Sequence, residues 1–121
     1  MSCEELYHAA LRMIGESARS VMHVERAVDV LRLLQVQWEA ALHEYAAGQE
    51  GAVAPSVRSL ADPLPFPKCF EAAATYALAA SLLEGEDAVR AQSYHARARE
   101  EIARLWDELP ADVHAIVDVY R

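Results

Sequence analysis

The stretch VERAVDVLRLLQVQWEAALHEY, residues 24–45, decides the fold class of this chain. Its apolar residues recur every three or four positions, which is the spacing of one face of an α-helix. The pattern continues for about six turns, and neither glycine nor proline interrupts it before Gly48. The apolar positions are Val24, Ala27, Val28, Leu31, Leu34, Trp38, Ala41, Leu42 and Tyr45. We therefore predict one unbroken helix here, the longest of the chain, ending at Gly48.

Three further helices are predicted around this stretch. Ser2 and Glu5 have the spacing of a capping box, which starts a helix that Gly15 would end. Residues 67–85 and 86–110 repeat the helical spacing and end at a glycine and a proline. Because β-branched runs are also few, we predict an all-α fold, a four-helix antiparallel bundle whose body spans residues 1–109.

Residues 48–67 separate the second and third predicted helices and are rich in proline and glycine. The alternating prolines before the third helix favour an extended path. A long segment without predicted structure usually has a role of its own. We expect either a short hairpin, weakly suggested by Val53 and Val57, or an arm lying across a neighbouring molecule. The residues expected at such an interface are Pro63, Leu64 and Phe66, with Arg97 and Arg99 on the last helix.

Residues 110–121 form a C-terminal tail beyond the predicted body. Its larger apolar residues are Val113, Ile116, Val117 and Tyr120. They fit one more helical face, although their β-branched content would also allow an added strand. Apolar residues exposed at a terminus often mark contact with a partner, so we predict that this tail docks on another chain.

The composition limits the classes of partner. The chain has 121 residues, enough for one domain, and a formal net charge of −8, which opposes binding to a nucleic acid backbone. Arginine makes up nearly all of the basic residues and suits forked contacts to carboxylates. No signal peptide or apolar run long enough to span a membrane is recognised. Cys3 and Cys69 are expected to be reduced in a protein made in the cytoplasm, although their spacing alone leaves a disulfide open.

No catalytic, metal or cofactor site is predicted. The five histidines lack a second ligand at a diagnostic spacing such as H-E-x-x-H. They are His8, His23, His43, His95 and His114. Adjacent carboxylates, as in Glu100-Glu101, point about 100° apart on a helix and cannot converge on one substrate atom. Trp38 and Trp106 lie on or beside apolar stripes without interleaved basic residues, so we expect them to pack rather than to stack on bases.

The order of these features resembles one known family. EELYHAALRMIG (4–15) is similar to the opening of tailed-phage head-to-tail adaptors, also called head-completion or packaged-DNA stabilisation proteins. A leucine-rich run over 27–39, closing on Trp38, resembles their second helix. SLADPLPFP (59–67) and FEAAATYALA (70–79) resemble their extended segment and third helix. The resemblance covers residues 3–105.

This resemblance implies a structural virion protein at the neck, between head and tail. Several copies would form a ring beneath the portal protein, typically a dodecamer, which extends the DNA channel and binds tail proteins. DNA would pass through the lumen without sequence-specific binding. In such adaptors the C-terminal segment reaches the portal, a role that residues 110–121 would take here.

Two other classes of function stay open from the residues alone. The first is a cytoplasmic all-helical protein-binding module, or a small regulatory homodimer, using the same apolar surfaces. The second is an enzyme with a pocket between helices that involves His23, His43 or His95, which we consider the weaker alternative.

Overall fold

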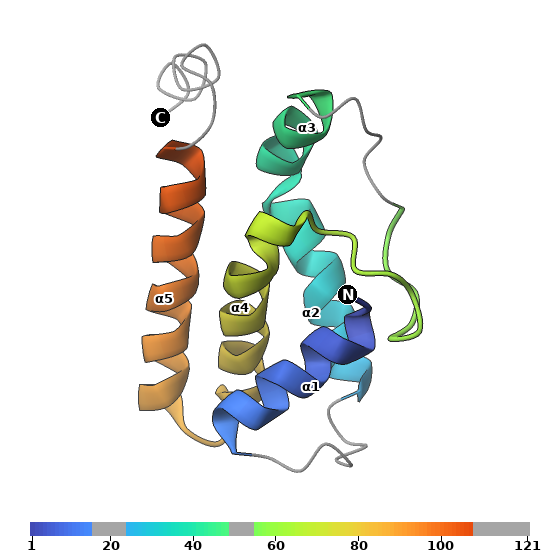
Figure 1. The fold of residues 1–121 in the computed structure, drawn as a ribbon. Coiled ribbons are helices and arrows are strands. Elements are labelled where there is room, and N and C mark those ends of the chain that lie inside the picture. Colours follow the sequence, from blue (N-terminus) through green and yellow to red (C-terminus); the bar gives the residue numbers. More distant parts are fainter. Residues whose placement is uncertain (16–23, 49–54, 108–121) are drawn as a thin grey trace.

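The chain folds into α-helices arranged around one central helix (Figure 1). The computed structural model describes residues 1–15, 24–48 and 55–107. Within these ranges the elements are α1 (Cys3–Ile14), α2 (Val24–Gln37), α3 (Glu39–Gly48), the short 3₁₀ helix η2 (Lys68–Phe70), α4 (Glu71–Leu83) and α5 (Ala88–Asp107). The predicted all-α class is confirmed.

α1 begins and ends as its sequence predicts. The Ser2 hydroxyl accepts a hydrogen bond from the Glu5 backbone N–H at 3.2 Å, and the Glu5 carboxylate accepts one from the Ser2 N–H at 3.2 Å. This capping box satisfies two backbone donors that the helix itself cannot pair. At the other end Gly15 has φ 82° and its N–H donates to the Arg12 carbonyl at 3.2 Å. Only glycine adopts this left-handed conformation without strain, so the helix ends here.

The helix predicted for residues 24–48 is divided at Trp38 into α2 and α3. Hydrogen bonds at 2.9 Å, from Trp38 N–H to the Leu34 carbonyl and from Leu42 N–H to the Trp38 carbonyl, connect the two. The Trp38 ring packs against Phe66 and Phe70, with centroids 5.4 and 6.1 Å apart. The prediction of one unbroken helix, the longest of the chain, is wrong, because α5 with 20 residues is the longest helix in the described residues. The apolar stripe is buried at Ala27, Leu31, Leu34, Ala41 and Leu42, whereas its members Val24, Val28 and Trp38 are half-buried and pack against the core.

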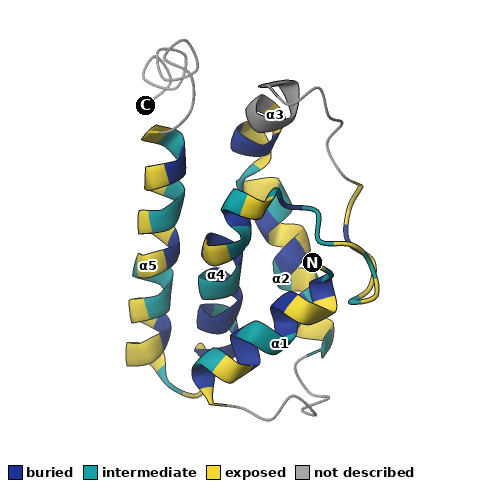
Figure 2. Cartoon of the chain, in the orientation of Figure 1, coloured by how far each residue is buried: buried dark blue, intermediate teal, exposed yellow. Residues whose placement is uncertain are grey.

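α4 is the central helix and is buried on nearly every side (Figure 2). It contacts α1, α2 and α5. Its buried residues are Ala73, Ala74, Ala77, Leu78, Ala79, Ala80, Leu82 and Leu83. A helix that is apolar all round is stable only inside a core, and the small alanine side chains let its neighbours approach closely. The hydroxyls of Thr75 and Ser81 donate to backbone carbonyls one turn earlier, at 2.8 and 3.0 Å, so both are satisfied within the helix.

α5 returns beside α4 after a short turn (Figure 1). The Asp87 carboxylate accepts the Arg90 N–H at 3.1 Å and thereby caps the start of the helix. The apolar stripe of α5 is buried at Ala91, Ala98 and Leu105 and half-buried at Tyr94 and Ile102, whereas Ala88 at the start of the helix is exposed.

α5 also holds the end of α1. The Tyr94 hydroxyl donates to the Met13 carbonyl at 3.1 Å, and the Arg90 guanidinium donates to the Ile14 carbonyl at 3.3 Å. Both carbonyls belong to the last turn of α1, where the helix offers no partner of its own. These long-range bonds fix α1 against the pair formed by α4 and α5.

Candidate functional site

The described part of the proline-rich segment, residues 55–67, is anchored to its own chain. The Gln35 side chain on α2 makes two hydrogen bonds to it: Nε2 donates to the Pro55 carbonyl at 3.1 Å, and Oε1 accepts the Val57 N–H at 2.9 Å. Val57 is 1% exposed and belongs to the core, not to a strand. Its partner in the weak strand signal, Val53, lies outside the described residues.

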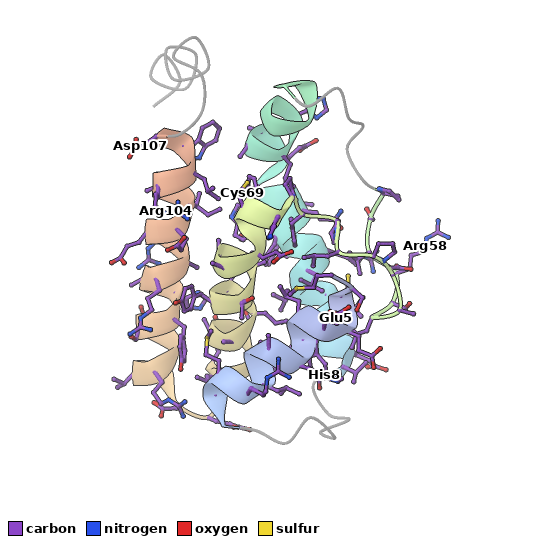
Figure 3. All side chains as sticks on the ribbon, in the orientation of Figure 1. Glu5, His8, Arg58, Cys69, Arg104 and Asp107 are labelled. Carbon is purple, nitrogen blue, oxygen red and sulfur yellow. The ribbon has the colours of Figure 1, made fainter. Side chains whose placement is uncertain are left out.

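A tight turn centred on Asp62 shapes the same segment. The Asp62 carboxylate accepts the backbone N–H groups of Arg58 at 2.8 Å and Ser59 at 3.1 Å. These two hydrogen bonds favour the charged form and hold the pKa of Asp62 below its ordinary value. The Arg58 side chain itself extends from the turn away from the helices (Figure 3).

The turn also closes the start of α1. The N–H groups of Cys3 and Glu4, unpaired within the helix, donate to the carbonyls of Asp62 at 3.0 Å and Leu60 at 2.9 Å. The Cys3 thiol donates to the Pro63 carbonyl at 3.6 Å. Burial, with a contribution from the nearby Asp62 carboxylate, raises the pKa of the Cys3 thiol. The proline-rich segment and the start of α1 are therefore held together by hydrogen bonds.

The three interface residues predicted on this segment occupy different environments. Pro63 is exposed, and it pairs with Ser2 in an isolated antiparallel bridge. Leu64 is half-buried, and its N–H donates to the Met1 carbonyl at 3.1 Å. Phe66 is 6% exposed and packs edge-on against Trp38. In this chain Pro63 is thus accessible to a partner, whereas Phe66 belongs to the core.

The two arginines predicted at the interface, Arg97 and Arg99, point to different surroundings. Both are exposed on α5. The Arg97 guanidinium lies over the Tyr76 ring of α4, 5.8 Å from its centroid. Arg99 lines a groove formed with α2. The structure therefore does not join them in one patch. The four tail residues predicted to bind a partner, Val113, Ile116, Val117 and Tyr120, lie outside the described residues.

Arg99 lies at the edge of an open groove in the helical body. The groove has a volume of about 690 Å³ and lies between α2 and α5, with Ala77 and Ser81 of α4 at its base. The apolar side chains of its walls are Val30, Leu33 and Leu34 of α2, Trp38 between α2 and α3, and Ala98, Ile102, Ala103 and Trp106 of α5. Polar side chains also line it: Arg26, Gln37, Glu84, His95 and Arg99. Small side chains on α4 leave this space open between the larger side chains of its neighbours.

Apolar exposure continues from the groove along α2. Leu33 is 54% exposed and Val36 is 69% exposed. The sequence prediction missed this surface because it followed only the core stripe of residues 24–45. A signal was present: Val30, Leu33 and Val36 recur every three residues beside that stripe.

The titratable groups of the described residues form one close contact at the groove. His95 Nε2 of α5 lies 2.8 Å from Glu84 Oε1 at the end of α4. His8 packs beside Tyr7 and His43 is exposed, while His23 and His114 fall outside the described residues. In the described ranges no three His, Cys, Asp or Glu side chains come together as a metal site would require. Cys3 and Cys69 are free thiols.

The accessible features of the described residues are the groove between α2 and α5, the exposed apolar residues of α2 and Pro63. None of the helices in the described ranges combines the length and apolar character needed to cross a membrane. Comparison of the chain with models of protein families, with curated proteins and with solved structures finds no match.

Proposed function

We propose that this protein is a structural subunit without catalytic activity, the head-to-tail adaptor of a tailed bacteriophage. The observation that carries the proposal is the open apolar surface on α2, where Leu33 and Val36 are 54% and 69% exposed beside the groove. Apolar residues that are exposed together beside a groove are a typical feature of protein–protein contacts. The surface supports subunit contact, and the resemblance to adaptors supports the more specific assignment.

The elements follow the order of the adaptor resemblance. α1 covers the EELYHAALRMIG stretch as far as Ile14, and α2 ends directly before Trp38. Residues 59–67 then lead through η2 into α4, which holds most of the FEAAATYALA stretch. In the proposed subunit α1, α2 with α3, α4 and α5 are the four rods of an antiparallel bundle. The proline-rich segment 48–67 is the extended loop between the second and third rods.

The proposed assembly is a ring of this subunit, typically a dodecamer, between portal and tail. The exposed face of α2, with Pro63, Arg97 and Arg99, contacts neighbouring subunits or tail proteins. Residues 110–121 contact the portal through Val113, Ile116, Val117 and Tyr120. A net charge of −8 disfavours adhesion of DNA, as a channel wall requires.

Co-purification with the portal protein of the same virus tests this function. Tagged portal oligomer is mixed with the full-length chain, and bound protein is measured after size-exclusion chromatography. We expect a complex with several copies of the chain per portal. An Ile116→Asp/Val117→Asp variant should bind much more weakly, because two carboxylates cannot enter an apolar contact unpaired.

The outcomes separate the parts of the proposal. A full-length chain that never binds portal contradicts the adaptor function, whereas equal binding by the Asp variant contradicts only the role of the tail. Leu33→Asp, with exposed Arg32→Asp as its matched control, tests the α2 face. If Leu33→Asp only converts a stable dimer into monomer and portal is never bound, the regulatory homodimer is favoured instead.

A further inference from the structure

The groove between α2 and α5 is complementary in position, length and chemistry to the segment of the chain that follows α5. We propose that, in the free subunit, residues 111–121 fold back as a helix and occupy this groove of their own chain. Their docking on the subunit goes beyond the proposed function. Only its consequence, competition with portal for the same apolar residues, rests on that function.

Position and length favour this occupant. α2 and α5 run in the same direction in Figure 1, and Trp38 and Trp106 line the groove near the ends of the two helices. The described chain leaves α5 at Asp107, one residue beyond Trp106. Residues 108–110 supply a connection of the length that joins antiparallel helices. α5 lines the groove from His95 to Trp106, about 16 Å, and residues 111–121 would span about 15 Å as a helix.

The chemistry of the segment complements the groove. Val113, Ile116, Val117 and Tyr120 have the spacing that amphipathic helices use to bind apolar grooves. Asp112, in the first turn of this helix, would add a carboxylate near its positive end.

Charge fits the same direction of docking. Arg26 and Arg99 line the groove, while the Glu84 carboxylate there contacts His95. A helix that returns antiparallel to α5 from Asp107 places Asp118 near the level of Arg99. Because the segment is tethered at the groove's own end, its effective concentration is in the millimolar range, which favours binding within one chain over binding between chains.

Paired cysteines test the docking in the full-length chain without portal. On a Cys69→Ser background, Val113→Cys, which the same register places within one residue of the level of Ala103, is combined with Ala103→Cys, which is exposed and lines the groove. The matched control combines Val113→Cys with Arg104→Cys, the next residue, which is exposed but points about 100° away. Cys3 is buried and common to both variants. The rate of disulfide formation within one molecule is followed by non-reducing electrophoresis and peptide mass mapping.

We expect the Ala103→Cys pair to close roughly tenfold faster or more than the Arg104→Cys pair, because only docking brings the Cα atoms within about 7 Å. Equal rates, or no disulfide in either variant, would overturn the proposal. Disulfides found only between molecules would assign the groove to a second copy and would equally overturn it.

A second measurement avoids introduced cysteines. The Ile116→Asp/Val117→Asp variant should make Trp38 and Trp106 more accessible to acrylamide quenching while far-UV circular dichroism still shows the helical body. Unchanged quenching contradicts docking. If the chain does not bind portal, the disulfide and quenching results still decide whether the tail docks in the groove. The two proposals can therefore be refuted independently.

Discussion

Replacing Phe66 by alanine tests whether this residue is part of the core or of an interface. The sequence places it among the interface candidates, because it lies in a proline-rich segment. In the structure it is 6% exposed, and its ring packs against Trp38 with 5.4 Å between centroids. A core residue contributes to the unfolding free energy of the isolated subunit, whereas an interface residue contributes mainly to association.

The expected loss follows from this burial. Truncating a buried phenylalanine to alanine lowers the free energy of unfolding by about 3–5 kcal/mol, and the lost edge-on contact with Trp38 is one part of that loss. Domains of this size are stable by about 5–15 kcal/mol, so the variant loses a large share of its stability. Its Tm should fall by roughly 10 °C or more. Val36→Ala is the matched control, because Val36 is 69% exposed and its truncation should change stability by less than about 0.5 kcal/mol.

Urea unfolding followed by far-UV circular dichroism measures both variants at the same protein concentration. The midpoint should fall for Phe66→Ala at unchanged slope, since a change in slope would indicate altered compactness. A loss below about 1 kcal/mol would refute the core assignment. If the stable variant then failed to associate with its partners, Phe66 would be an interface residue after all.

Three other predictions concern single residues. Gly15→Ala should cost about 1–2 kcal/mol because Gly15 has φ 82°, whereas Gly85→Ala, whose Cβ would meet no atom within 4 Å, should be near neutral in the same urea assay. Gln35→Ala should cost about 1–3 kcal/mol by leaving the N–H of buried Val57 without its partner, and faster amide exchange at Val57 would locate the loss. Because folding lowers the pKa of Asp62, its ionised carboxylate stabilises the folded state fully at any pH above the ordinary pKa of an aspartate. This contribution to stability is lost as the pH falls through the lowered pKa of the folded state. Asp62→Asn should therefore flatten the fall of the urea midpoint between about pH 6 and pH 2, and an unchanged slope would contradict this assignment.

Features set by residues close in sequence could be predicted. The capping box of Ser2 and Glu5 and the glycine that ends α1 depend on partners within one turn, so their spacing suffices. The division of the helix at Trp38 could not be predicted, because neither glycine nor proline marks it in the sequence. The packing of the Trp38 ring against Phe66 and Phe70 could not be predicted either, because these residues lie far from it along the chain. The spacing of apolar residues predicts which face of a helix is buried, but it does not predict which residues distant in sequence pack against that face.

The candidate site shows the same limit. Pro63 and Arg99 are accessible, as an interface requires, but Phe66 is buried and Arg97 lies over the Tyr76 ring of its own chain. The composition of the proline-rich segment suggested a short hairpin or an arm lying across a neighbouring molecule, whereas residues 55–67 are hydrogen-bonded to their own chain. This anchoring depends on the side chain of Gln35, which lies on α2 and has an unremarkable sequence context.

The two sides of α4 differ: one is closed by packed helices and the other borders an open groove. On one side α1 packs against α4, with the end of α1 held by α5 and its start closed by the Asp62 turn. On another side α2 and α5 both contact α4 but leave the groove open above Ala77. Figure 2 shows α4 as the most continuously buried helix between them. The closed side is held by hydrogen bonds at both ends of α1, so its apolar residues are already covered. A partner would therefore bury more apolar surface by binding on the open side. Under the two proposals, the tail of the same chain occupies the groove and an adjoining subunit covers the neighbouring face of α2, and neither contact requires rearrangement of the closed side.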